Sequence, residues 1–188
     1  MPSRHFSLTA RVVLPAVLLL LLPGSAARRP AAEPMPRWLH DHMAALTAGT
    51  ATWVTDNSGF KSADEPFDAY ATSWSWGLGR QSLKGRLYGI KDGKEAGTFW
   101  EFRLYWQPSE KKAVMLQFGN GAVGEGTMWE AGPDSTESDQ TFSWPDGSQT
   151  RVKHIEKLSG GENLTVSFDW SGTEWQPRRT YIWYLQKD

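Results

Sequence analysis

Residues 98–107, near the middle of the chain, carry the pattern that most restricts the fold. Every even-numbered position from Trp100 to Trp106 is large and apolar, whereas Glu101 and Arg103 lie between them. Side chains of a β-strand point alternately to its two faces, so this spacing predicts a strand with one buried face. A strand of this kind needs a sheet around it.

Short runs of aromatic and β-branched residues follow one another along the rest of the chain, separated by turn residues. Asp92-Gly93 and Asn120-Gly121 are dipeptides preferred in two-residue hairpin turns. We therefore expect ten strands, near residues 51–56, 67–76, 81–91, 95–107, 111–119, 122–131, 136–144, 149–158, 163–170 and 175–186. The connections are too short for crossover helices, which predicts an antiparallel meander.

One segment, residues 37–47, has helical periodicity instead. Leu39, Met43 and Leu46 repeat at helical spacing, and Pro36 occupies the position favoured for the start of a helix. We expect a single N-terminal helix here.

The expected turns also predict which side chains share the buried face of the sheet. A three-residue loop at 108–110 places Leu116 opposite Phe102, and the turn at Asn120-Gly121 continues that face to Glu125 and Trp129. On the later strands the same face is predicted to carry Phe142, Trp144, Val152, His154, Glu156, Leu158, Leu164, Val166, Phe168, Trp170, Arg179, Tyr181 and Trp183.

A ten-stranded antiparallel sheet with one continuous apolar face must cover that face, and closing the sheet also removes both of its edges. The predicted fold class is therefore all-β, an up-and-down barrel of about ten strands, with the helix at one mouth or across the wall. A two-sheet sandwich is the alternative. Barrels of more than about eight strands leave interior space that side chains only partly fill, so we expect a cavity.

Composition excludes several classes of function. The chain has 20 basic and 21 acidic residues and a net charge of -1, without long runs of either sign, so no nucleic-acid partner is expected. It has no cysteine, which excludes disulfides, thiol catalysis and thiolate metal sites. The oligomeric state is left open by the sequence.

The N-terminal residues have the composition of a targeting signal. Arg4 and Arg11 precede an apolar run at 12–22, and the small residues of Ser25-Ala26-Ala27 follow it. The run is shorter than the roughly 20 residues that a membrane-spanning helix needs. We expect a signal peptide at 1–27, a flexible leader at 28–36 and one barrel domain at 37–188, in an exported protein, periplasmic or secreted, with no membrane span after cleavage.

Four polar residues fall on the predicted buried face: Glu125, His154, Glu156 and Arg179. Burying such groups without partners is costly, so one interpretation is a Glu–Arg pair at the rim, or a register slip that places a residue outside. The other is a cavity whose aromatic walls hold a small apolar or amphipathic ligand while these groups bind its polar end. The predicted ligand-binding residues are Trp76, Trp100, Glu125, Trp129, Trp144, His154, Glu156, Arg179, Tyr181 and Trp183.

No catalytic residue, metal site or cofactor is predicted from the residues themselves. The alternative functions are an enzyme that uses His154 and a carboxylate in the same cavity, a carbohydrate-binding protein with exposed tryptophans, and a structural envelope protein with a filled barrel. Catalysis would need a defined carboxylate spacing or a histidine-activated nucleophile, and the sequence establishes neither.

The order of elements resembles the lipocalin-like (calycin) barrels, over most of residues 37–186. A helix precedes Gly49-Thr50-Ala51-Thr52-Trp53, which opens the first strand, and a hairpin meander follows. Lipocalins usually show Gly-x-Trp at this point, whereas three residues separate Gly49 from Trp53 here. Within this group the chain is similar to the ten-stranded barrels that include nitrobindin and related small exported domains. That resemblance implies an interior ligand, and haem bound through a histidine near the C-terminal strands, where His154 is the one available.

Overall fold

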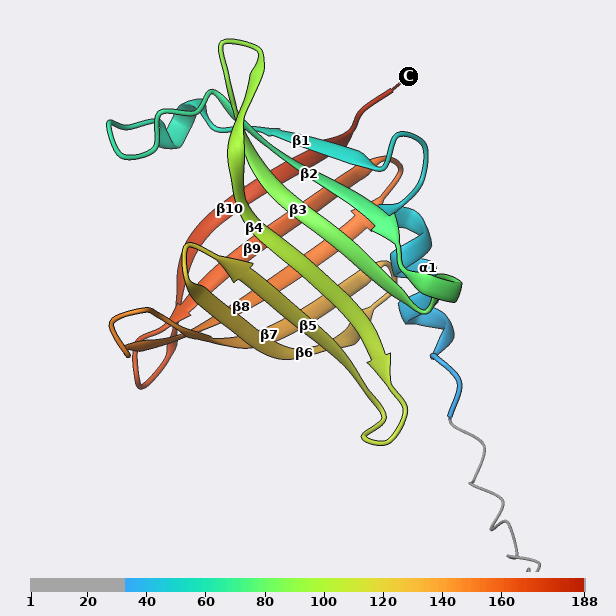
Figure 1. Cartoon of the computed structure of the whole chain (residues 1–188). Coiled ribbons are helices and arrows are strands. Elements are labelled where there is room, and N and C mark those ends of the chain that lie inside the picture. The colour runs from blue at the N-terminus through green and yellow to red at the C-terminus, as the bar shows by residue number, and fades with distance from the viewer. Residues whose placement is uncertain (1–32, 188) are drawn as a thin grey trace, which may run out of the picture. The chain divides into compact units, whose positions relative to one another are not determined.

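The computed structural model describes residues 33–187, which form a closed antiparallel barrel of ten strands with one α-helix (Figure 1). The predicted signal peptide at 1–27 lies outside the described residues, as does most of the leader. The elements are α1 (Arg37–Leu46), β1 (Thr52–Asp56), β2 (Ala69–Trp76), β3 (Ser82–Lys91), β4 (Lys94–Gln107), β5 (Lys112–Gly119), β6 (Ala122–Gly132), β7 (Ser135–Ser143), β8 (Gln149–Ser159), β9 (Glu162–Trp170) and β10 (Trp175–Leu185). The predicted fold class is confirmed.

Each strand pairs with its neighbours in sequence, and the first strand pairs with the last. Closure is made by β1 and β10, where Trp53 lies opposite Leu185 and Val54 opposite Tyr184. The hydroxyl of Thr50 donates a hydrogen bond of 2.9 Å to the carbonyl oxygen of Gln186 just beyond these pairs. The wall therefore has no free edge in the described part of the chain, which includes no helix long and apolar enough to cross a membrane.

The two expected hairpin turns form as predicted. Asp92 and Gly93 have φ angles of 51° and 70°, and Asn120 and Gly121 have φ angles of 51° and 77°. Two consecutive positive φ angles are typical of the type I′ turn, whose twist matches that of the flanking strands.

Helix α1 closes one end of the barrel. Its apolar side, with Leu39, Met43 and Leu46, packs against a cluster that includes Leu83 and Leu104 from the inner wall. Figure 1 shows α1 beside the ends of the strands, where the chain enters β1. This end of the barrel is a packed apolar core.

A hydrogen bond ties this helix to the wall. The indole nitrogen Nε1 of Trp53 donates to the carbonyl oxygen of Leu46 at 2.9 Å, and Trp53 is only 2% exposed. Trp53→Phe keeps most of the ring but leaves a buried carbonyl without its donor, so the free energy of unfolding should fall by about 1–2 kcal/mol. Urea unfolding measures this. Trp170→Phe, at a site 36% exposed, is the control, and an equal loss in both variants would contradict the assignment.

The register of β4 against β5 differs from the prediction by one residue. Leu104 lies opposite Met115, because the connection has four residues rather than three and Lys111 adopts a positive φ of 52°. A shift of one residue reverses the faces of a strand. Leu116 therefore points outward, and Gln117 points inward opposite Phe102.

The reversal continues into β6 through the tight turn, and a second reversal occurs in β9. The turn before β9 is Gly160-Gly161, both with positive φ, so β9 begins earlier than expected and Asn163 points inward. In β3 and β4 two irregularities displace the register by two residues, which preserves the predicted face. The predicted inward residues that instead lie on the outer face are Val114, Leu116, Phe118, Val123, Glu125, Thr127, Trp129, Leu164, Val166, Phe168 and Trp170.

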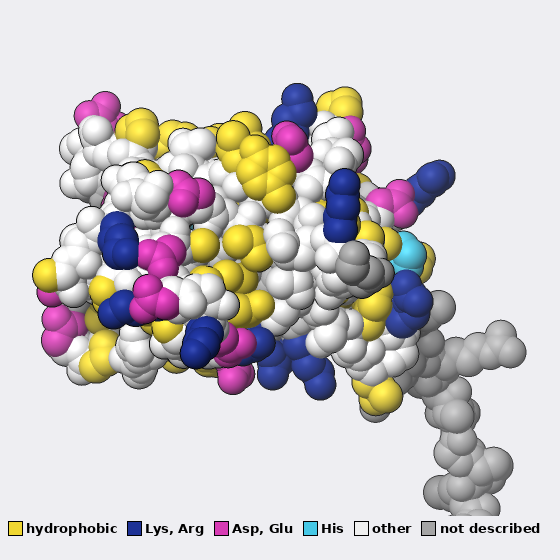
Figure 2. Space-filling view, turned by 90° about the horizontal axis from the view of Figure 1, so that it is seen from above, with side chains coloured by type: hydrophobic (Ala, Val, Ile, Leu, Met, Phe, Trp, Pro, Cys, Tyr) yellow, Lys and Arg dark blue, Asp and Glu magenta, His cyan; other side chains and the backbone are white. Residues whose placement is uncertain are grey.

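Apolar side chains on the outside of the wall lie among charged ones (Figure 2). Long basic side chains cover some of them: Nζ of Lys153 lies 5.0 Å from the ring centre of Phe168, and the guanidinium of Arg151 lies 5.7 Å from that of Trp170. The aliphatic stems of such residues shield apolar surface while their charges stay in water.

Candidate ligand-binding cavity

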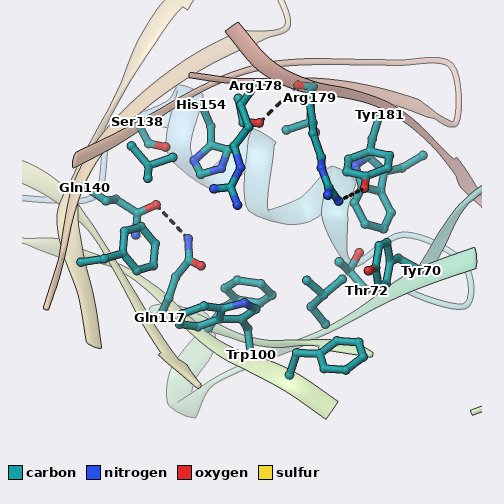
Figure 3. Close-up of a pocket in the computed structure, with 18 of the residues that line it drawn as sticks. Tyr70, Thr72, Trp100, Gln117, Ser138, Gln140, His154, Arg178, Arg179 and Tyr181 are labelled. Atoms are coloured by element: carbon teal, nitrogen blue, oxygen red, sulfur yellow. Dashed lines mark hydrogen bonds between the residues drawn. The ribbon is translucent and has the colours of Figure 1, made fainter. Parts of the chain in front are cut away.

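The barrel encloses a cavity of about 550 Å³. Figure 3 looks into it, with α1 behind the space and the labelled side chains pointing inward from strands all around the wall. Much of the lining is aromatic: the rings of Trp100 and Phe142 meet edge to face with centres 5.5 Å apart, and those of Trp74 and Phe102 stack at 5.3 Å. The space is bounded by rigid, flat side chains.

Seven of the ten residues predicted to bind a ligand line this cavity. They are Trp100, Trp144, His154, Glu156, Arg179, Tyr181 and Trp183. Those from β8 and β10 face inward as the alternation predicted, and the structure brings them together on adjoining parts of the wall.

The other three do not line it. Glu125 and Trp129 lie on the outer face, because the connection before β5 is one residue longer than expected and reverses both β5 and β6. Trp76 is on the inner face but packs in the cluster around α1, with its ring centre 5.6 Å from that of His40. The inward placement of Glu125 and Trp129 was wrong, and Trp76 contributes to the closed end rather than to the cavity.

Arg179 forms the centre of a hydrogen-bonded clamp at the open end. Its guanidinium donates to both carboxylate oxygens of Glu65, at 2.6 and 2.7 Å, and to the hydroxyl of Tyr181 at 2.9 Å. The hydroxyl of Tyr70 also donates to Glu65, at 2.6 Å, and that of Tyr181 donates to Asn57 at 3.1 Å. The connection between β1 and β2, which carries Glu65, is thereby fastened to β10.

The electrostatics of the clamp follow from these bonds. The hydrogen bonds from Arg179 hold the pKa of Glu65 below its usual value, whereas burial and the neighbouring carboxylate raise the pKa of Tyr70. Both parts of the simpler interpretation are thus found: a Glu–Arg pair at the rim, although with Glu65 as the acid, and a register slip that places Glu125 outside.

A β-bulge supplies a second arginine. Pro177 pairs with Phe168 and Arg179 pairs with Ser167, so Arg178 is an extra residue in β10 and lines the cavity together with Arg179 (Figure 3). Its ion pair in the described chain is a contact of 3.5 Å with Asp169, between two half-exposed side chains. Sequence alternation could not find Arg178, because strict alternation places it outside.

A buried amide pair lies on the opposite wall. Nε2 of Gln117 donates to Oε1 of Gln140 at 2.8 Å, and both side chains are buried (Figure 3). The residues come from β5 and β7. Gln117 was missed because the predicted register placed it on the outer face.

His154 and Glu156, on β8, lie inside the cavity. Burial is the main cause that lowers the pKa of His154 to about 4, and the positive charge of Arg178 adds to it. Burial likewise raises the pKa of Glu156, and lowers that of His42 on α1 to about 4. At neutral pH both imidazoles are therefore uncharged, and each can accept a hydrogen bond or ligate a metal.

Residues 33–187 contain no group of three or more histidine, aspartate or glutamate side chains placed to hold a metal ion. Comparison of the sequence with models of protein families finds no match, and comparison with curated proteins finds none either. The closed ten-stranded barrel is compatible with a lipocalin-like fold. The function must therefore be argued from the cavity.

Proposed function

We propose that this protein binds a small amphipathic molecule inside the barrel. The observation that carries the proposal is the cavity of about 550 Å³, which lies within the size range of small-molecule sites, roughly 300–1,000 Å³. Its walls combine large aromatic faces with several groups of polar side chains. Such a lining holds the apolar body of a ligand by burial and orients it by hydrogen bonds.

The inner face of β6 helps to keep this space open. Gly124 packs against the ring of Phe142, and a Cβ atom at Gly124 would lie 2.5 Å from that ring. A larger residue would push Phe142 into the cavity. The absence of a side chain here supports a wall shaped around a space rather than a filled core.

The alternative functions have less support. His154 makes no hydrogen bond to a carboxylate within the described chain, so the base of the enzyme hypothesis has no orienting acid. On the outer face Trp170 and Trp175 are inclined at 61°, with Arg151 above both rings, which is not the flat platform that a sugar ring requires. Binding without chemistry remains the function that the geometry supports best.

Haem, implied by the resemblance to nitrobindin, can be tested against the same residues. His154 is the histidine that lines the cavity in the described chain, and its low pKa keeps the ring neutral, as an axial ligand must be. A bound haem would supply iron chemistry there. A Soret absorption band after purification, lost in His154→Ala, would identify haem as the ligand.

The compartment in which the protein acts is a separate part of the proposal. The basic residues, apolar run and small residues at the N-terminus support export, and the absence of cysteine favours a bacterial envelope over a eukaryotic secretory route.

Filling the cavity tests the proposal directly. Ser138 lines the cavity and is only 3% exposed, so Ser138→Phe should occupy part of the space. We expect binding of the fluorescent probe 1-anilinonaphthalene-8-sulfonate to weaken about tenfold or more, a loss of about 1.4 kcal/mol. Ser143→Phe, on the exposed face of the same strand, is the matched control.

Equal binding by both variants, or no binding by the unaltered protein, would contradict interior binding. Circular dichroism of both variants checks that the barrel is retained. Native mass spectrometry of protein purified from its own host then identifies any molecule that remains bound.

A further inference from the structure

Glu156 is a mostly buried carboxyl group, with its side chain 20% exposed, and it has no cationic partner among the described residues. No lysine or arginine of the described chain lies within ion-pair distance of it. Its nearest polar contacts are Nε2 of His42 at 3.9 Å and a long hydrogen bond of 3.5 Å from Nδ2 of Asn163. A buried carboxyl in such surroundings is costly unless something compensates its charge.

Three other buried polar atoms around this carboxyl also lack partners: Nε2 of His42, Oγ1 of Thr136 and Oδ1 of Asn163. Each belongs to a side chain at least nine-tenths buried. Thr136 is paired with Glu156 across β7 and β8, Asn163 comes from β9, and His42 comes from α1. These side chains come from four separate elements, and two of them, Glu156 and Asn163, line the cavity.

The chemistry of these atoms indicates what would satisfy them. The amide oxygen of Asn163 only accepts hydrogen bonds, a neutral imidazole nitrogen and a hydroxyl can accept, and an ionised Glu156 accepts with a negative charge. A group with several donors and one positive charge fits this set. A primary ammonium has three N–H donors in a compact head.

We propose that the inner end of the cavity is a subsite for the primary ammonium group of an amphipathic amine, whose apolar part lies along the aromatic walls. This rests on the proposed function, since it assigns the ligand class of the same cavity. Tyr181 and Trp183 line the wall beside this end, and aromatic faces attract cations.

The two arginines that line the cavity, Arg178 and Arg179, lie at another level of the barrel. His154 shares its level with Ser167 and Arg179, whereas Glu156 shares its level with Thr165 and Tyr181, one inward position closer to α1. Arg179 is already paired with Glu65, and Arg178 contacts Asp169. Neither arginine compensates Glu156, so the position for a cation beside it is left to a ligand.

Three probes with the same alkyl chain and different heads test this assignment: decylamine, decanol and decanoate. Calorimetric titration at pH 7.5 should show decylamine binding about tenfold or more tightly than decanol, because a charge-assisted hydrogen bond is roughly twice as strong as one between neutral groups. Glu156→Gln should remove that preference by weakening decylamine alone. Thr136→Val, which removes one acceptor without changing charge, should weaken decylamine by a smaller factor.

Glu125→Gln, on the outer face, is the matched control and should bind all three probes like the unaltered protein. Equal affinities for the amine and the alcohol would overturn the ammonium subsite, and so would an unchanged preference in Glu156→Gln. Tighter binding of decanoate would also overturn it and would place the polar head at Arg178. If none of the three probes binds, the interior-binding function itself fails.

Discussion

Arg179→Met should lower the free energy of unfolding by about 2–4 kcal/mol at neutral pH. The substitution keeps the side-chain stem but leaves Glu65 without the two hydrogen bonds from the guanidinium. Glu65 is 19% exposed in its side chain and Arg179 29%, so water can compensate only part of the loss. The expected cost is therefore below that of breaking a fully buried ion pair, about 3–5 kcal/mol.

Urea unfolding of four proteins separates the pair from its surroundings: the unaltered protein, Arg179→Met, Glu65→Met and the double variant. Each single variant leaves one charge without its partner, whereas the double variant removes both charges. The loss of unfolding free energy in the double variant should therefore be smaller than the sum of the two single losses. Arg86→Met is the control, since Arg86 pairs with Glu95 at an exposed site where ion pairs contribute little. A loss in Arg179→Met no larger than that in Arg86→Met would refute the clamp.

The clamp should also limit local opening of the connection between β1 and β2. It is the contact that fastens the connection between β1 and β2 to β10 at the open end, where Glu65, Tyr70 and Tyr181 line the cavity. Releasing it should increase proteolytic cleavage within residues 57–68, because a chain segment must open locally to enter a protease.

Acidification from pH 6.5 to pH 4 should destabilise the barrel through His42. Its pKa is lowered by burial from 6.5 to about 4, so over this range the unfolded chain binds a proton that the folded protein does not. Stability therefore falls as the pH falls, by about 2–3 kcal/mol for this one group. At pH 7 the imidazole is mostly unprotonated in both states, so nearly all of the contribution is present.

His42→Leu isolates this contribution. Leucine fills similar space on the apolar side of α1 and cannot titrate, so the difference in unfolding free energy between pH 7 and pH 4.5 should be smaller in the variant. His154 titrates in the same direction, whereas burial raises the pKa of Glu156, which favours the folded state at low pH. Comparison of variant with unaltered protein cancels the contribution of His154 to first order, and making the comparison in a Glu156→Gln background removes the carboxyl that lies 3.9 Å from His42. An identical pH dependence would show that His42 does not become protonated on unfolding.

Much of the fold could be predicted because each strand carries its own local signals. The turns at Asp92-Gly93 and Asn120-Gly121 set two hairpins, and the alternation in β8 correctly placed His154 and Glu156 on the inner face. These features depend on neighbours within a few residues. A chain with such short connections has little choice but to pair sequential strands.

The errors arose where the outer face of a strand is at least as apolar as its inner face. On β9 the outer face carries Leu164, Val166 and Phe168, while the inner face carries Thr165 and Ser167. The rule that the more apolar face of a strand points inward assumes a dry interior, but an inner face that borders a cavity can be polar. Apolar residues outside are tolerated because long basic side chains such as Lys153 cover them.

The sequence by itself determined the strand order, the helix before the first strand and the inward faces of β8 and β10, since these follow from local periodicity and turn chemistry. Only the tertiary structure decided the registers of β5, β6 and β9, the bulge that turns Arg178 inward, the clamp between Glu65 and Arg179, and the group of unpartnered atoms around Glu156. The physical reason is that one residue more or less in a loop reverses a whole strand, and contacts between residues more than a hundred positions apart exist only once the barrel has closed.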